Sequence, residues 1–228
     1  MIIDIVSDLH GFYPKLDGGD LLIVAGDLTG RDAPHEYNQF ARWIRQLEYK
    51  KKIVIAGNHD NWIIESNNLG IEESSQLGGF EYLYDSGTEF SMGSDNLSPP
   101  LKIWGSPWTK TFPRMNPHCK AFTVDTEEEL ESKWKLIPDD IDILVTHSPA
   151  YAILDGIQID DGSLFHVGST TLRTHVERIK PKLHVCGHVH EGYGQLLLKH
   201  AGPNTICVNA SHVNERYKPV NKPIRIEL

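Results

Sequence analysis

Seven side chains of the types that bind divalent metals follow five separate apolar runs of this chain. Each run consists mainly of Val, Ile and Leu and stops at a polar turn, which is typical of a buried strand. In an open α/β sheet, ligands bind beyond the carboxyl ends of the strands. One sheet could therefore bring all seven side chains together as a dinuclear metal site. In chain order, they are Asp8, His10, Asp27, Asn58, His147, His188 and His190.

The local motifs differ in how specifically they indicate this site. Asp8 and His10 are two residues apart, so an extended segment places both on one side. GNHD at 57–60 and GHVH at 187–190 are more specific, because their glycines allow a sharp turn directly after a strand. Carboxylates, imidazoles and an amide oxygen, without a thiolate, suit Mn, Fe, Co, Ni or Zn. The residues therefore predict a metalloenzyme.

Helices are expected between the strands. Apolar residues at helical spacing predict one helix over 33–47, with Asp32 as its N-cap. A cluster of acidic residues predicts the start of a second helix over 125–136. A third is expected over 169–180, because Pro181 ends the pattern. We expect these helices to pack outside the sheets.

The remaining strands predict a mixed architecture. Apolar segments at 81–106 and 195–228 favour antiparallel pairing, whereas the strand–helix alternation elsewhere favours parallel pairing. We therefore expect an α/β fold, a four-layer αββα sandwich of two mixed β-sheets flanked by helices. The segments 92–100, 109–120 and 155–168 are expected to be irregular loops, the last two long enough to wall a pocket.

Composition restricts the class of protein further. The chain has 228 residues, 39% of them hydrophobic, which favours a single domain over 1–228. A formal charge of −9 makes nucleic acid an unlikely partner, since phosphates attract clusters of Lys and Arg. No apolar stretch approaches the roughly 20 residues that span a bilayer. Three cysteines without metal-like spacing, and no signal peptide, predict a reduced, cytoplasmic protein.

The motifs DLH, GD, GNHD, TH and GHVH occur in the order found in calcineurin-like metallophosphoesterases, which the chain resembles from residue 4 to about 192. Within that superfamily it is most similar to the metallophosphoesterase-domain-containing proteins. The supporting stretches include IWGSPW, LIPDDIDILVTHSPA and VNAS. Some members of that subgroup carry a Gly in the last histidine motif and are weakened catalysts. Here both His188 and His190 are present.

The resemblance implies a dinuclear centre of two divalent metal ions, with Mn the first candidate and Fe, Zn, Co, Ni or Mg as others. It assigns one ligand that both metals share and a group of three further ligands to each metal. In this assignment Asp27 would bind both metals, which would supply a hydroxide for attack on the phosphoryl group. The groups are Asp8, His10 and His190 for one metal, and Asn58, His147 and His188 for the other.

The resemblance also implies residues that act on the substrate. His59 would stabilise the transition state and protonate the leaving oxygen, a task suited to a pKa near neutrality. Asp60 either supports His59 in catalysis or caps the turn that follows. Arg31 is either a phosphate-binding residue or an ordinary loop arginine, and Asn58 would contact substrate as well as metal.

The substrate is expected to be a small phosphorylated molecule, and the resemblance favours a phosphodiesterase acting on a nucleotide or cyclic nucleotide. A phosphomonoesterase or protein phosphatase on the same site is the alternative. A non-catalytic binding or scaffolding protein is the alternative from another class. Ser106 and Trp108 either lie near the substrate or pack a strand end, and His118 and His166 are the other histidines that could reach the pocket. The oligomeric state is left open.

Overall fold

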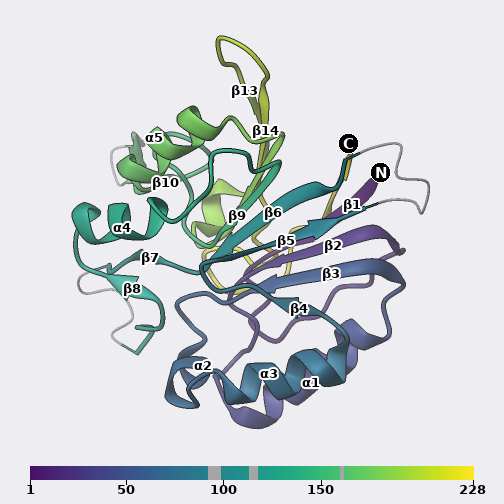
Figure 1. The fold of residues 1–228 in the computed structure, drawn as a ribbon. Coiled ribbons are helices and arrows are strands. Elements are labelled where there is room, and N and C mark those ends of the chain that lie inside the picture. The colour runs from purple at the N-terminus through teal and green to yellow at the C-terminus, as the bar shows by residue number, and fades with distance from the viewer. Residues whose placement is uncertain (92–98, 113–117, 160–161) are drawn as a thin grey trace.

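Two β-sheets pack face to face in the computed structural model, which describes residues 1–91, 99–112, 118–159 and 162–228 (Figure 1). The strands of the first sheet are, in spatial order, β15 (Ile224–Glu227), β1 (Ile2–Val6), β2 (Gly19–Ala25), β3 (Tyr49–Ile55) and β4 (Glu81–Tyr82). Those of the second are β13 (Gly194–Leu198), β14 (Thr205–Asn209), β12 (Leu183–Cys186), β9 (Ile143–Thr146), β6 (Leu101–Ser106) and β5 (Ser86–Phe90).

Both sheets are mixed, as expected. Strands β1, β2, β3 and β4 run parallel, and β15 closes that sheet antiparallel to β1. In the second sheet β14, β12, β9 and β6 run parallel, with β13 and β5 antiparallel at the edges. Strand β6 thus pairs with β9 in parallel, whereas its segment was expected to be antiparallel throughout. Each sheet therefore offers a group of parallel strands with aligned carboxyl ends.

Helices cover the two outer faces and complete the four-layer αββα sandwich (Figure 1). Those on the first sheet are α1 (Pro34–Arg45), α2 (Asn61–Glu65) and α3 (Leu69–Gly78), and those on the second are α4 (Glu127–Trp134) and α5 (Thr170–Ile179). Each helix in the described part of the chain is too short or too polar to cross a bilayer.

The main core lies between the sheets. Ile3 and Ile5 of β1 face this core together with Ile143 and Val145 of β9, and all four are fully buried. Burial of each such side chain stabilises the fold by roughly 1.5–3 kcal/mol. Because both sheets contribute apolar side chains, their strand ends are held at a fixed spacing.

The three predicted helices exist, each shorter by one or two residues at its ends. The prediction that Asp32 caps α1 is wrong. Helix α1 begins after Ala33, and the Asp32 carboxylate instead accepts the backbone N–H of Trp62 at 3.0 Å and the hydroxyl of Tyr37 at 2.6 Å. Asp32 therefore joins the start of α2 to α1.

Two of the segments expected to be irregular contain short strands. Within 109–120, β7 (Thr109–Lys110) pairs with β8 (Thr123–Val124). Within 155–168, β10 (Gly156–Gln158) and β11 (Leu164–His166) form an antiparallel hairpin. The third segment, 92–100, lies mostly outside the described residues.

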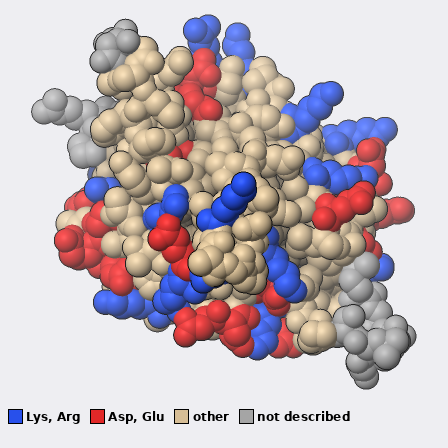
Figure 2. Space-filling model, turned by 90° about the horizontal axis from the view of Figure 1, so that it is seen from above, with Lys and Arg blue, Asp and Glu red and all other residues tan. Residues whose placement is uncertain are grey.

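Charges of both signs share the surface. Figure 2 shows Lys and Arg side chains interleaved with Asp and Glu around the face seen from above. Nucleic-acid-binding surfaces instead gather basic residues into a patch or stripe.

Candidate metal centre

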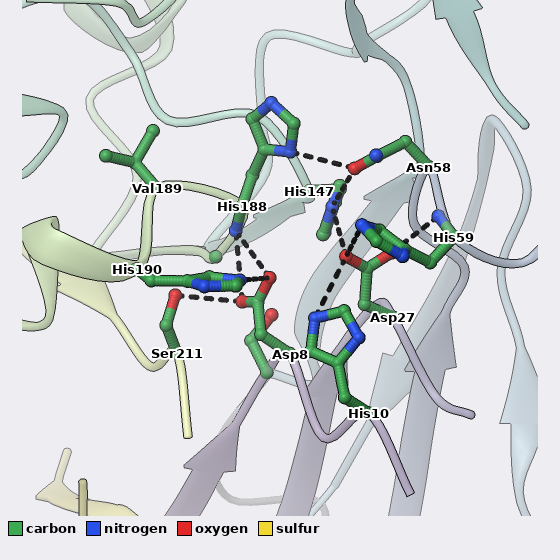
Figure 3. A network of polar contacts seen from close by, with 12 residues as sticks. Asp8, His10, Asp27, Asn58, His59, His147, His188, Val189, His190 and Ser211 are labelled. Carbon is green, nitrogen blue, oxygen red and sulfur yellow. Dashed lines mark hydrogen bonds and ion pairs between the residues drawn. The ribbon is translucent and has the colours of Figure 1, made fainter. Parts of the chain in front are cut away.

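All seven expected ligands meet at one point, where strands of both sheets end (Figure 3). Three strands of the first sheet, β1, β2 and β3, lead into the four ligands from Asp8 to Asn58. Two strands of the second, β9 and β12, lead into the three histidines from His147 to His190. The expectation that one sheet delivers the whole set is therefore wrong. Strand pairing depends on contacts between distant segments, which the local patterns do not contain.

The first group lies around Asp8. The ligand atoms of Asp8, His10 and His190 lie within 4.8 Å of one another, and His190 Nε2 is 3.3 Å from Asp8 Oδ1. In the second group, Asn58 Oδ1 lies 3.0 Å from His147 Nε2 and 2.8 Å from His188 Nδ1. The structure thus brings together the three residues of each group that the resemblance implies.

Asp27 lies between the groups. Its Oδ2 is 3.6 Å from Nε2 of His10 in the first group and 3.5 Å from Nε2 of His147 in the second. Its Oδ1 accepts the backbone N–H of His59 at 2.9 Å. A carboxylate in this position can contact two ions at once.

Sharp backbone turns bring the ligands together. Asp8, His10, Asp27 and His188 have φ between 43° and 67°, in the left-handed region that non-glycine residues rarely adopt. Such residues typically cost about 1–3 kcal/mol each, and they concentrate at functional sites. The surrounding fold therefore offsets a local cost in order to keep these side chains on one centre.

Hydrogen bonds fix the orientation of several ligands. Asp8 Oδ2 accepts the hydroxyl of Ser211 at 2.8 Å and the backbone N–H of His188 at 3.0 Å. His147 Nδ1–H donates to the carbonyl of Ala25 at 2.8 Å, which turns Nε2 toward Asp27. His190 Nδ1–H likewise donates to a backbone carbonyl, that of Asn214, at 3.0 Å. Partners of this kind are typical of metal-binding side chains.

The charge states of most ligands suit metal binding. Burial opposes ionisation of Asp8 and Asp27, yet the nearby imidazoles hold the pKa of both carboxyls below the usual range. Burial lowers the pKa of His10 to about 4 and of His188 to about 3, so both rings are neutral. Burial acts on His147 in the same direction, but the Asp27 carboxylate outweighs it and raises the pKa of His147 to about 9. His147 therefore has to release a proton before it can bind a metal.

The Asp60 side chain takes neither of its two expected positions. Its carboxylate is fully buried and accepts the backbone N–H groups of Gly57 at 2.8 Å and of Asp27 and Leu28 at 3.0 Å. It makes no side-chain cap for α2. Burial and the Asp27 charge raise the pKa of Asp60 to about 8. Asp60 thus holds the loop that carries Asp27.

A cavity of about 740 Å³ opens beside the centre, with His10 and His59 on its wall. Tyr217 also lines it, and its ring lies edge-on to those of His10, His59 and His190, with centroids 4.8, 5.9 and 5.2 Å away. Tyr217 and Ser211 both lie beyond the metal-ligand motifs. Each nevertheless falls in a stretch that supports the family resemblance, Ser211 in VNAS and Tyr217 at the start of the YKPVNKPI that follows it.

The other expected pocket residues lie in three different places. Arg31 and His118 line the cavity. Ser106 and Trp108 both donate to the Asp85 carboxylate, at 2.6 and 2.7 Å. Ser106 ends strand β6, and Trp108 packs against the apolar clusters on the outer faces of the sheets. For these two the packing interpretation is therefore favoured. His166 bonds to Asp155 at 2.6 Å in the β10–β11 hairpin.

Fold and site together define a calcineurin-like phosphoesterase. The model of that family matches residues 1–192, and the chain belongs to the family. Among its relatives, human Metallophosphoesterase domain-containing protein 1 is 35% identical, over 98% of this chain and 69% of that protein. UPF0046 protein C25E10.12 of Caenorhabditis elegans is 30% identical, over 100% of this chain and 79% of its own length.

Solved structures support the fold. TT1561 of Thermus thermophilus matches with a TM-score of 0.59 and 18% identity, over 99% of this chain and 98% of that one. Family membership and the cluster of Asp and His residues make this chain a metal-dependent phosphoric ester hydrolase.

Proposed function

We propose that this chain is a phosphodiesterase that requires two divalent metal ions, Mn first among them, and hydrolyses a small nucleotide or cyclic nucleotide. The observation that carries the proposal is the convergence of all seven candidate ligands on one centre. The donor set fits such ions, because it combines carboxylate, imidazole and amide groups. In addition, His10 Nε2 is buried and has no hydrogen-bond partner within the described residues. A metal ion would satisfy that nitrogen.

We propose the division of ligands that the resemblance implies. Asp8, His10 and His190 would hold one ion, Asn58, His147 and His188 the other, and Asp27 both. When bound, the ions would supply a nucleophile at neutral pH and offset the charge of the phosphoryl oxygens.

His59 is the candidate general acid. It follows Asn58 directly, and its Nε2 lies 3.9 Å from Asp27 Oδ2 on the wall of the cavity. From there it can donate a proton to an ester oxygen held at the centre, while Asp27 fixes its backbone. His59→Asn should lower kcat and leave both metals bound.

The cavity supports a substrate that is a phosphate ester with an aromatic part. Its volume of about 740 Å³ is in the usual range for small-molecule sites. Phe12 and Tyr217 line it with 43% and 44% of their surface exposed, so either ring can stack on a nucleobase. Arg31 lines the same wall and can bind phosphoryl oxygens in a bidentate manner.

Parallel assays with bis-p-nitrophenyl phosphate and p-nitrophenyl phosphate test the proposal, with each divalent metal in turn. We expect faster hydrolysis of the diester, and of 3′,5′-cyclic nucleotides, with Mn. A strong preference for the monoester would favour the phosphomonoesterase alternative. A protein that binds no metal and stays inactive with Mn would favour the scaffolding alternative.

The same proposal covers the setting of the enzyme. A single domain over 1–228 is supported by the core that joins the two sheets. The three free cysteines, Cys119, Cys186 and Cys207, support a reducing compartment such as the cytoplasm.

A further inference from the structure

The ring of His59 contacts a thiol. Sγ of Cys119 lies 3.1 Å from His59 Nδ1, which is within hydrogen-bonding distance for sulfur. Cys119 is half-buried and lines the same cavity as His59. Asp60, which follows His59 in the chain, turns instead to backbone N–H groups. The thiol is therefore the group that faces the outer nitrogen of this ring.

A second set of contacts holds Cys119 in this place. Asn61 Nδ2–H donates to the carbonyl of His118 at 3.1 Å, and Asn61 Oδ1 accepts the backbone N–H of Lys120 at 3.1 Å. One amide side chain thus binds the backbone on both sides of Cys119. Asn61 is also two residues from His59, so the ring and its partner are fixed by the same short segment.

The surroundings of the ring set the direction of this hydrogen bond. On the opposite side, His59 Nε2 lies 3.9 Å from the Asp27 carboxylate, an acceptor that favours a hydrogen on Nε2. A neutral ring with its hydrogen on Nε2 has Nδ1 free to accept. Burial and the charges of Asp27 and Asp32 raise the pKa of Cys119 to about 12, which keeps the S–H available as a donor.

We propose that Cys119 is a positioning residue: its S–H donates to His59 Nδ1 and so presents Nε2–H to the reaction centre. The role of that hydrogen as the proton given to the leaving oxygen rests on the proposed function. The tautomer of His59 does not depend on the proposed function, and it can be measured without any turnover of substrate.

Nitrogen-15 NMR of the full chain, labelled at histidine, tests the tautomer. The His59 resonances are assigned by their absence in His59→Asn and recorded both without metal and with Zn. In the wild type we expect His59 to carry its hydrogen on Nε2. Cys119→Ser keeps a donor and should keep this tautomer, whereas Cys119→Ala should give a mixture. Cys207→Ala, a buried cysteine in the core beneath the outer helices, should match the wild type.

Kinetics with bis-p-nitrophenyl phosphate form the second arm. We expect Cys119→Ala to lower kcat about 10-fold, with KM and metal content unchanged, a size typical for loss of an orienting partner. Cys119→Ser should restore most of the rate. Circular dichroism shows whether each variant is folded.

The NMR and kinetic experiments distinguish the role of Cys119 from the proposed function. An Nδ1–H tautomer in the wild type, or identical His59 shifts in wild type and Cys119→Ala, overturns the role of Cys119. The expected tautomer in a protein that hydrolyses none of the esters overturns the proposed function and leaves the Cys119 contact standing.

Discussion

Asp60 holds the backbone of Asp27 in place: its Oδ2 accepts the N–H of Asp27 at 3.0 Å, while its Oδ1 accepts that of Leu28 at 3.0 Å. The same carboxylate binds Gly57, at the start of the GNHD motif. The last residue of that motif thus ties the loop after β3 to the loop after β2. Its contribution to the centre is to fix the position of Asp27.

Asp60→Asn should weaken the centre by this route. The amide places an NH2 group where one oxygen accepts, so at least one buried N–H loses its partner, at a cost of about 1–3 kcal/mol in the free energy of unfolding. We expect a lower Tm and a higher dissociation constant for metal, measured by calorimetry. His59→Asn is the comparison and should change neither. If Asp60→Asn kept its Tm and its metals but lost kcat, Asp60 would belong to the chemistry.

The sequence predicts the positions of the candidate ligands because each of them lies at most a few residues beyond an apolar run. A strand that ends in a turn is a local property, and the glycines of the two specific motifs fall at those turns. The three predicted helices likewise rest on local signals, namely the spacing of apolar residues, an acidic first turn and a proline stop. Helix α3 was not predicted, because it buries small residues such as Gly70 and Ser74 in place of an apolar stripe.

Contacts between distant segments could not be read from the sequence. Asp60 and Asp32 are both acidic residues next to a helix start, where capping is the usual prediction, but each binds groups from another loop. Cys119 reaches His59, and Tyr217 reaches His10, across long stretches of chain. Their positions depend on how the loops pack, which no local pattern describes.

Asp27→Ala should remove the link between the two groups of ligands. Because Oδ2 of Asp27 lies within 3.6 Å of a histidine in each group, both ions would lose a ligand. We expect metal content to fall from about two ions per chain to one or fewer, and hydrolysis to fall at least about 100-fold. Elemental analysis after dialysis measures the first. Asp17→Ala, an exposed carboxylate, should keep both ions. Two tightly bound ions in Asp27→Ala would exclude the bridging position.

Metal binding should release protons at neutral pH. The Asp27 carboxylate raises the pKa of His147 to about 9, so without metal this ring is protonated at pH 7.5. A ligand ring must be neutral, so binding releases that proton and the apparent affinity should rise as the pH approaches 9. Calorimetric titrations in two buffers of different ionisation enthalpy count the protons. A binding enthalpy that is the same in both buffers would contradict the paired, protonated His147.

Gly187→Ala should damage the centre although it replaces no ligand. A methyl group at this position would overlap Oδ2 of Asp8 and the hydroxyl of Ser7. Overpacking of this kind typically costs about 1–3 kcal/mol, and here the side chain that must move is a candidate ligand. We expect a lower Tm and weaker metal binding. Gly79→Ala is the matched control, because its φ of 65° adds strain while its surroundings are open. Only its Tm should fall.

His184 should make the protein sensitive to acid. Burial lowers the pKa of His184 to about 4 from its usual 6.5, and its Nε2 bonds to Thr146 Oγ1 at 2.9 Å. The unfolded chain therefore binds this proton more readily than the folded one. The stabilisation that the neutral, buried His184 contributes is fully present above pH 6.5 and is lost as the pH falls toward 4. At about 1.36 kcal/mol per pKa unit, the loss is on the order of 3 kcal/mol.

Thermal unfolding of the metal-free protein between pH 7 and 4 measures this contribution. His184→Leu removes the titrating ring, so its Tm should fall less steeply with decreasing pH than that of the wild type. His35→Gln, at an exposed position in α1, should retain the wild-type slope. Equal slopes for His184→Leu and the wild type would mean that protonation of the buried ring costs the folded protein no stability, which would contradict this prediction.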